Sequence, residues 1–138
     1  MAEYANYHVG QKLLLRKGDE VLFLKIPGHD VLDLPGGRID DNENDKNLQS
    51  ILEREIREEL GVDVQYKLGP ILFQYRRFVP QKNFKVFITV HEAEYMGGNI
   101  TLSDEHESYQ WANPKERGFT ENDFFSAEEY TAFKKYFS

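Results

Sequence analysis

The stretch Gly37–Val62, GRIDDNENDKNLQSILEREIREELGV, decides how this chain is organised. Its second half carries apolar residues at helical spacing, namely Leu48, Ile51, Leu52, Ile56 and Leu60. Apolar positions that recur every three or four residues predict an amphipathic helix with one face in the core. Gly61 directly follows the last of them, at the position where a glycine commonly ends a helix.

Three glutamates lie on the same side of this predicted helix as its apolar stripe. On a helical wheel, Glu55 and Glu59 fall inside the stripe and Glu58 falls at its edge. Carboxylates that lie close together repel one another, and partly buried ones need a neutralising partner. Their hard oxygen atoms select Mg²⁺ or Mn²⁺ over Zn²⁺. The periodicity leaves two interpretations open: a divalent-metal site, or a solvated helix with ion pairs such as Arg54 with Glu58.

Residues on both sides of these glutamates complete a longer pattern. It consists of Pro35-Gly36-Gly37, then Glu43, and then Arg54-Glu55-Ile56-Arg57-Glu58-Glu59-Leu60-Gly61-Val62. This pattern resembles the signature of the Nudix hydrolases, and the resemblance extends over about residues 13–111. There is one departure. Ten residues separate Glu43 from Arg54 where the family has seven, so the role of Glu43 stays open.

The resemblance implies an α/β fold, with a mixed β-sheet sandwiched between helices in an α/β/α arrangement. It also implies divalent-metal-dependent hydrolysis, with Mg²⁺ or Mn²⁺ as the cofactor. Glu55, Glu58 and Glu59 would act in catalysis by binding the metal ion. The backbone carbonyl of Gly37 would be a further ligand, and Arg54 would orient a neighbouring glutamate.

A segment downstream, Ser103–Trp111 (SDEHESYQW), is similar to one that many Nudix members place opposite the catalytic helix. In those proteins a glutamate of this segment often supplies a further metal ligand or the general base. Glu105 is the best match for this catalytic and metal-binding role, and Asp104 and Glu107 are the alternatives. We expect His106 to make a structural hydrogen bond.

Basic and aromatic residues are candidates for substrate binding. The chain concentrates positive charge in one predicted hairpin, at Arg76, Arg77, Lys82 and Lys85. These side chains would bind the distal phosphates of a nucleotide or a nucleic-acid 5′ end; a charged sheet edge that prevents aggregation is the alternative. Tyr75 either stacks on a base or packs in the core. The substrate-binding candidates are Arg38, Tyr75, Arg76, Arg77 and Lys82.

Strand and turn signals surround the helix on both sides. The predicted strands are residues 8–17, 20–26, 31–34, 62–77 and 84–95, with a short extended piece at 100–102. Gly18-Asp19 predicts a turn, Gly69-Pro70 predicts a bend, and residues 79–83 connect the last two strands. The Ser126 to Glu129 spacing is a capping box, which starts a last helix with an aromatic face.

Composition limits the other classes of function. A chain of 138 residues with 40% hydrophobic residues is long enough for one globular domain, residues 1–138. It has no cysteine, which excludes disulfides, thiol catalysis and cysteine-bound zinc. No apolar run is as long as a membrane span, and we expect a cytoplasmic enzyme that is a monomer or a homodimer. The net charge of −7 disfavours a general nucleic-acid surface, with an RNA 5′ end as the exception.

The resemblance defines the substrate as a nucleoside diphosphate linked to another group. The first hypothesis is a nucleoside triphosphate pyrophosphohydrolase. A dinucleoside polyphosphate hydrolase is the alternative, because Glu105-His106-x-x-Tyr109-x-Trp111 looks like a stretch in diadenosine tetraphosphate hydrolases. Nucleotide sugars also stay open. From another class, a Nudix-fold sensor would bind a nucleotide without cleaving it, but such domains usually lack part of the glutamate cluster that this chain retains.

Overall fold

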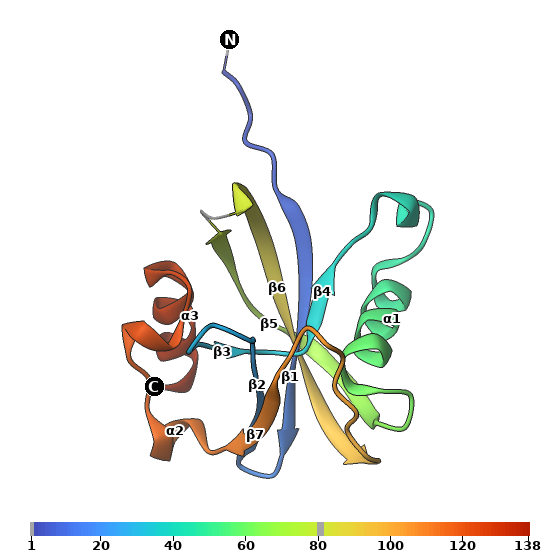
Figure 1. Cartoon of the computed structure of the whole chain (residues 1–138), viewed down its shortest axis with the longest axis vertical. Coiled ribbons are helices and arrows are strands. Elements are labelled where there is room, and N and C mark those ends of the chain that lie inside the picture. Colours follow the sequence, from blue (N-terminus) through green and yellow to red (C-terminus); the bar gives the residue numbers. More distant parts are fainter. Residues whose placement is uncertain (1, 80–81) are drawn as a thin grey trace.

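The structure is a computed structural model that describes residues 2–79 and 82–138 (Figure 1). Its strands are β1 (His8–Lys17), β2 (Glu20–Lys25), β3 (Leu32–Asp33), β4 (Gly36–Arg38), β5 (Gln65–Val79), β6 (Phe84–Gly97) and β7 (Ser108–Ala112). Its α-helices are α1 (Leu48–Leu60), α2 (Pro114–Arg117) and α3 (Ala127–Phe137), and short 3₁₀ helices span Asp41–Glu43 and Glu121–Asp123. The segment before β1 extends away from the body of the molecule (Figure 1).

The strands form one mixed sheet with β1 at its centre. β1 pairs in parallel with β6 and antiparallel with β2 and β4. β2 pairs with β1 at Arg16 and Lys17, whereas β4 pairs with it from Gly10 to Lys12. β3 and β7 pair with β2, and β5 extends the sheet beyond β6. The sheet therefore divides along β1, and this division brings the short strand β4 into contact with α1.

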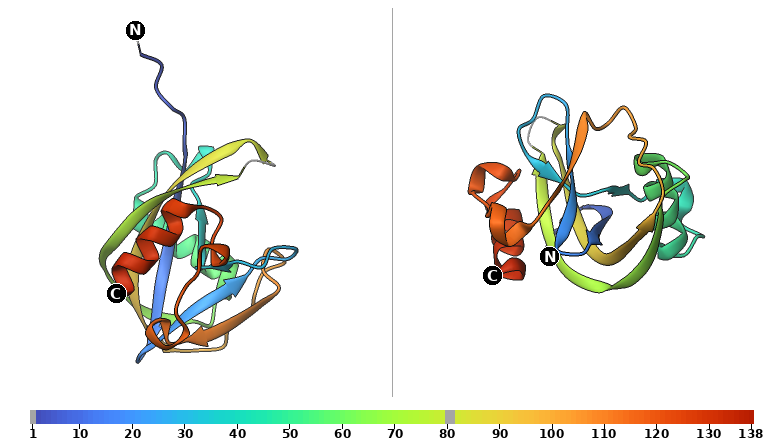
Figure 2. Two further views of the ribbon diagram at one scale, coloured as in Figure 1. Left: turned by 90° about the vertical axis from the view of Figure 1, so that its left-hand side faces the viewer. Right: turned by 90° about the horizontal axis from the view of Figure 1, so that it is seen from below.

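Alternate residues of β1 and β2 face two separate hydrophobic cores, because successive side chains of a strand point to opposite faces. The core on the α1 side contains Leu13, Leu15, Leu22, Leu24, Leu52, Ile56, Leu60 and Ala93. The core on the other side includes Leu14, Val21, Phe23, Tyr75, Phe124 and Phe133. Helices α1 and α3 lie on opposite sides of the sheet (Figures 1 and 2). The predicted α/β/α arrangement is confirmed.

Capping side chains define where the two long helices begin. Asn47 caps α1, because its side chain accepts a hydrogen bond of 2.8 Å from the backbone N–H of Ser50. Ser126 caps α3 by accepting from the backbone N–H of Glu129 at 3.3 Å. The capping box predicted for this helix is not closed, because the Glu129 carboxylate binds Arg77 instead.

The structure corrects several details of the predicted elements. Leu48 belongs to the apolar stripe but is 59% exposed, because it lies in the first turn of α1. Residues 100–102 form no strand, and the backbone N–H of Thr101 donates to Leu60 at the end of α1. The strands β4 and β7 and the helix α2 were not predicted. Pro80 and Gln81, in the predicted connection 79–83, lie outside the described residues. Of the helices within the described ranges, none is long and apolar enough to cross a membrane.

Candidate active site

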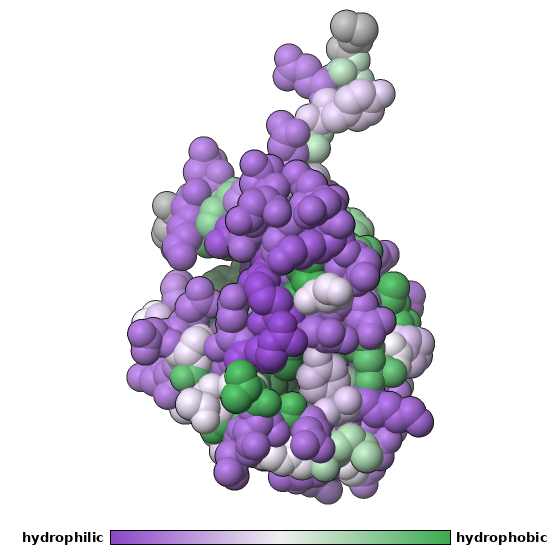
Figure 3. Space-filling view, turned by 90° about the vertical axis from the view of Figure 1, so that its right-hand side faces the viewer, coloured by the Kyte–Doolittle hydropathy of each residue, from purple (hydrophilic) through white to green (hydrophobic). Residues whose placement is uncertain are grey.

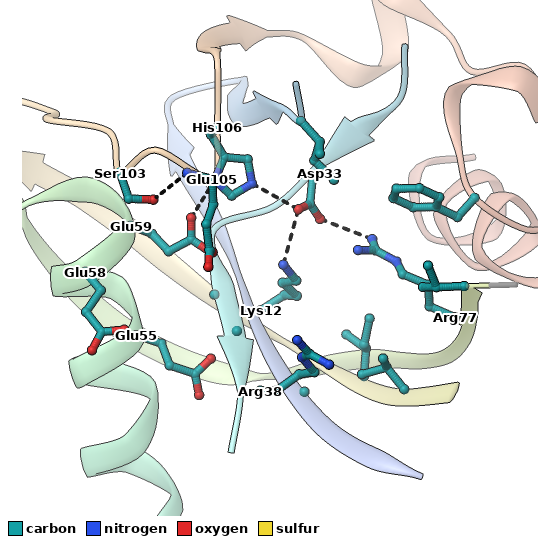
Figure 4. Close-up of a pocket in the computed structure, with 18 of the residues that line it drawn as sticks. Lys12, Asp33, Arg38, Glu55, Glu58, Glu59, Arg77, Ser103, Glu105 and His106 are labelled. Carbon is teal, nitrogen blue, oxygen red and sulfur yellow. Dashed lines mark hydrogen bonds and ion pairs between the residues drawn. The ribbon is translucent and has the colours of Figure 1, made fainter. Parts of the chain in front are cut away.

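A cavity of about 700 Å³ lies beside α1 and is lined also by residues of β1, β4, β5, β6 and the loop 103–106. This volume is in the range of pockets that bind nucleotide-sized ligands. Glu55, Glu58 and Glu59 of α1 lie at one end and Arg77 lies at the other (Figure 4). The Arg77 guanidinium is 4.7 Å from the ring centroid of Phe125. The face of the molecule that carries α1 is mostly hydrophilic (Figure 3). The acidic part of the sequence pattern therefore lies in a large open pocket.

Two glycines bring the backbone of β4 close to β1 and α1. Gly36 has a φ of +141°, and a Cβ there would lie 2.0 Å from the backbone oxygen of Gln11. A Cβ on Gly37 would lie 2.6 Å from Oε2 of Glu55. Glycine is required at Gly36, where a side chain would overlap the backbone of β1, whereas a side chain at Gly37 would displace the Glu55 carboxylate.

The sheet register argues against the predicted metal-binding role of the Gly37 carbonyl. Gly37 lies opposite Gln11 in the antiparallel pair of β4 with β1. Residues two positions away on each side, Pro35 and Ile39, hydrogen-bond to β1 through their backbones. By the alternation of an antiparallel ladder, the Gly37 carbonyl also faces β1. Gly37 instead provides the space that the Glu55 carboxylate occupies.

Glu55 is a deeply buried carboxylate without a hydrogen-bond donor. Its side chain is 1% exposed, and neither carboxylate oxygen has a hydrogen-bond partner within the described ranges. Arg54 Nη2 lies 3.8 Å from its Oε1. Burial raises the pKa of Glu55 to about 8, although Arg54 and Lys12 oppose this shift. Such a group costs free energy in the folded chain, and a bound cation would remove that cost.

Arg54 connects the loop before α1 with the glutamates of the helix. Its guanidinium donates to both carboxylate oxygens of Glu43, at 2.6 and 2.9 Å, and to Glu58 at 2.9 Å. Glu43 is buried and also accepts from the backbone N–H of Asp40. The role of Glu43 was left open by the three extra residues. In the structure Glu43 holds Arg54, and residues 44–46, within the longer spacing, form a turn before Asn47.

The third glutamate, Glu59, contacts a buried histidine from the loop before β7. Oε2 of Glu59 and Nδ1 of His106 lie 2.6 Å apart, as an ion pair without hydrogen-bond alignment. Nε2 of His106 lies 3.2 Å from Oδ2 of Asp33 (Figure 4). Burial alone would lower the pKa of His106, but its contacts with Asp33 and Glu59 raise it to about 9. The expected structural contact of His106 is therefore present, and it reaches the acidic end of the cavity.

Asp33 is the centre of a buried ionic network at the floor of the cavity. Lys12 Nζ lies 3.3 Å from its Oδ2, and Arg77 Nη2 lies 3.1 Å from its Oδ1. Arg77 also donates to Glu129 of α3, at 2.5 Å. Burial would raise the pKa of Asp33, but Lys12, Arg77 and His106 together hold it well below its usual range. The network links the core beneath α3 to the site on α1.

The predicted substrate-binding residues divide into two groups. Arg38, Arg77 and Lys82 line the cavity, although Arg77 is engaged by Asp33 and Glu129. Tyr75 and Arg76 do not line it, which corrects the prediction for these two. Tyr75 is buried among the aromatic residues under α3, and Arg76 is paired with Glu128 at 2.7 Å. Arg76 points away because neighbouring residues of β5 face opposite sides of the sheet, whereas Tyr75 shares the face of Arg77 but is covered by the aromatic core under α3.

The segment before β7 places two of its three candidate carboxylates at the cavity. Asp104, Glu105 and His106 line the cavity, and Glu105 is exposed at its mouth. Glu107 does not line it and lies 3.6 Å from Lys25 in an ion pair. Of the three candidate carboxylates, Asp104 and Glu105 are therefore positioned to reach a bound ligand.

Two cavity residues were missed by the sequence analysis, Lys12 and Asp33. Both are charged residues inside otherwise apolar strands, in QKLLL and VLDLP, and both are buried. A charge in such a run is uncommon and is normally paired, which is a signal that could have identified them. His29 and Phe125 were also missed; their rings lie 5.4 Å apart, and both line the cavity.

The donors at the acidic end fit Mg²⁺ or Mn²⁺. Among the residues that the structure describes, no three His, Asp or Glu side chains already converge as a formed metal site. Mg²⁺ is commonly held by one or two carboxylates together with water and substrate phosphates. Glu55 offers two oxygens without partners, and Glu59 and Glu58 lie beside it on the same helix. These hard oxygen donors match such an ion, and the chain has no cysteine to favour a softer one.

Comparisons with known proteins agree with this fold. The NUDIX domain model matches residues 7–133. The MutT protein from Methanosarcina mazei Go1 is 24% identical, with a TM-score of 0.76 over 98% of this chain and 96% of that chain. A MutT Nudix hydrolase from Burkholderia pseudomallei is 19% identical, with a TM-score of 0.72 over 94% and 98%. An ADP-ribose pyrophosphatase from Streptococcus suis is 15% identical, with a TM-score of 0.59 over 94% and 91%.

A comparison with curated protein sequences found no match. The NUDIX model nevertheless covers nearly the whole chain, and the chain therefore belongs to the Nudix hydrolase family. The family consists of hydrolases that act on nucleotide-type substrates and generally need a divalent metal ion.

Proposed function

We propose that this enzyme hydrolyses a nucleoside triphosphate to the monophosphate and pyrophosphate, with Mg²⁺ or Mn²⁺ as its cofactor. The observation that carries the proposal is the Glu55 carboxylate, which is buried beside the cavity with both oxygens unpartnered in the described structure. A buried carboxylate in this state calls for a cation, and a nucleotide bound with its metal ion supplies one.

Glu55, Glu58 and Glu59 are the residues that would hold the metal ion. An ion bound there would neutralise charge on the phosphates and lower the pKa of an attacking water. Arg54 keeps Glu58 near the site through its hydrogen bond of 2.9 Å, and Glu43 fixes Arg54 in turn. Gly37 is omitted from the ligand set because its carbonyl faces β1.

The rest of the cavity offers groups that suit a nucleotide. Arg38 and Lys82 are positively charged residues in its lining, and they would bind the distal phosphates. His29 and Phe125 provide aromatic surface, on which a base would stack. Glu105 at the mouth of the cavity is the proposed general base, and Asp104 is the alternative.

A dinucleoside polyphosphate is the weaker hypothesis for the substrate. It depended on the Glu105-His106-x-x-Tyr109-x-Trp111 stretch, but neither Tyr109 nor Trp111 lines the cavity. Trp111 packs instead against Tyr95, with ring centroids 5.3 Å apart, and against the ammonium group of Lys17. Of this stretch, Glu105 and His106 line the cavity, and these two residues do not distinguish between the two substrates.

The proposal is tested by assaying a panel of nucleotides with Mg²⁺ and with Mn²⁺. The panel contains nucleoside triphosphates, dinucleoside polyphosphates, ADP-ribose and nucleotide sugars, and the release of phosphate and pyrophosphate is measured. We expect pyrophosphate from triphosphates, loss of turnover with a chelator, and recovery with excess metal. Tight nucleotide binding without any turnover would instead identify a sensor.

A matched control shows that the site on α1 is responsible. Glu59→Gln removes a carboxylate of the cavity, whereas Glu107→Gln removes a nearby carboxylate that lies outside it. We expect turnover to be lost in the first variant and retained in the second. Equal turnover in the two variants would contradict the proposed site.

A further inference from the structure

Glu59 is held in place by one neighbour. The described residues provide its side chain with no hydrogen bond, and its single ion pair is the contact of Oε2 with His106 Nδ1 at 2.6 Å. This differs from Glu58, which Arg54 holds by a hydrogen bond. The side chain is buried, and among the described residues the contact with His106 is the one polar contact that orients its carboxylate.

His106 is itself fixed from the opposite side of its ring. Its Nε2 lies 3.2 Å from Asp33 Oδ2, and both residues are buried. Asp33 cannot turn away, because Lys12 and Arg77 contact its two oxygens and the backbone N–H of Leu34 donates to Oδ1 at 2.9 Å. The ring therefore connects a rigid anchor to an otherwise unsupported glutamate (Figure 4).

We propose that His106 is a positioning residue, which holds the Glu59 carboxylate toward the metal site through Nδ1 while Asp33 fixes the ring through Nε2. The inference rests on the function proposed above and adds a residue to it. Groups that orient a ligand carboxylate contribute to metal affinity without touching the ion, and their loss commonly weakens affinity about ten- to a hundredfold.

The competing explanation is that His106 serves only to neutralise Asp33 in the folded chain. Two substitutions separate these roles, because amide groups can replace one ring nitrogen at a time. In His106→Asn the side-chain amide nitrogen takes the place of Nδ1, which faces Glu59. In His106→Gln it takes the place of Nε2, which faces Asp33.

The test is the dissociation constant for Mn²⁺, measured by electron paramagnetic resonance of the free ion, together with the free energy of unfolding. We expect His106→Asn to bind Mn²⁺ nearly as tightly as the wild type, and His106→Gln to bind it about ten- to a hundredfold more weakly. The inference is overturned if His106→Gln binds Mn²⁺ as tightly as His106→Asn, or more tightly.

His91 offers a matched control. It is a half-buried histidine on β6 that does not line the cavity, and its Nε2 has no hydrogen-bond partner in the described residues. His91→Asn and His91→Gln should therefore bind Mn²⁺ equally. Unequal affinities in this pair would mean that the Asn and Gln substitutions differ for reasons unrelated to Glu59, which would overturn the inference.

A second measurement needs no substitution and avoids the risk that a variant does not fold. In the ¹⁵N-histidine spectrum of the wild-type protein, Mg²⁺ should shift the Nδ1 resonance of His106 and leave that of His91 unchanged. An unmoved His106 resonance in a protein that binds Mg²⁺ overturns the inference alone. A wild-type protein that neither binds the ion nor hydrolyses nucleotides overturns the proposed function as well.

Discussion

Glu55 and Glu129 are equally buried glutamates on helices that cover opposite faces of the sheet, and the chain treats them differently. Each is 1% exposed. Glu129 of α3 accepts from Arg77 at 2.5 and 3.3 Å. Glu55 of α1 has no hydrogen-bond donor on either oxygen within the described ranges, and Arg54 approaches no closer than 3.8 Å.

The difference separates a carboxylate with an internal partner from one that, under the proposed function, would bind an external cation. A buried charge is tolerated when an internal partner neutralises it, as Arg77 does for Glu129. Near Glu55, the guanidinium of Arg54 is directed instead to Glu43 and Glu58. The burial of Glu55 therefore lowers the stability of the metal-free protein, and a metal ion bound at the proposed site would offset this loss.

The largest effect should follow from a substitution at the acidic end. We expect Glu59→Gln to leave the fold intact and to lower turnover by at least about a hundredfold, because it removes a charge that the metal ion requires. Steady-state kinetics at saturating Mg²⁺ measure the loss, and circular dichroism checks the fold. Near-normal turnover of the variant would contradict the assignment of Glu59 to the metal site.

Replacing each of the two buried glutamates with glutamine, in separate variants, tests this comparison. Glu129→Gln should destabilise the fold by about 3 kcal/mol, because it leaves Arg77 short of a buried partner. Glu55→Gln should leave stability unchanged or increase it in metal-free protein at pH 7, because no internal charge depends on it. Urea unfolding with a chelator measures both, and a similar loss in the two variants would contradict the distinction.

A pH titration tests whether internal partners keep the buried Asp33 carboxylate ionised in the folded chain. The pKa of Asp33 is lower in the folded chain than in the unfolded one, because Lys12, Arg77 and His106 surround it. Its contribution to stability is therefore present above the unfolded pKa and is lost as the pH falls toward the folded one. Relative to Asp33→Asn, the wild type should lose about 1.4 kcal/mol per pH unit below about pH 4.

Urea unfolding of the wild type and of Asp33→Asn between pH 2 and 5 would measure this difference. Below about pH 4 the free energy of unfolding should fall more steeply in the wild type than in the variant. Equal slopes in the two proteins would mean that Asp33 is not held ionised by its neighbours.

The local patterns of the sequence predicted α1, α3, the first hairpin and the long hairpin of β5 and β6, because each depends on residues near one another in the chain. The helical wheel also placed Glu55 and Glu59 among the apolar residues, and both are buried. β4 was missed because two of its three residues are glycines, which carry no strand signal. β7 was missed because its pairing with β2 joins distant parts of the chain.

The network around Asp33 was beyond prediction for the same reason. Its partners Lys12, Arg77 and His106 are separated from it by 21, 44 and 73 residues, and no local spacing relates them. The Tyr75 and Arg76 errors have another origin. A cluster of candidates in one strand was assigned to one site, although alternation sends Arg76 to the opposite face, and Tyr75, on the same face as Arg77, packs in the core under α3.

Two arginines provide the last and smallest test, because each lies over a phenylalanine ring but only one of them lines the cavity. Arg38 lies over the ring of Phe84 and lines the cavity. Arg76 lies over the ring of Phe78 and is paired with Glu128 outside the cavity. We expect Arg38→Ala to raise KM for the nucleotide about tenfold, the value of one lost charged hydrogen bond, and Arg76→Ala to leave KM unchanged. Steady-state kinetics of both variants with the same substrate would measure this contrast. A higher KM in Arg76→Ala would return that residue to the substrate site.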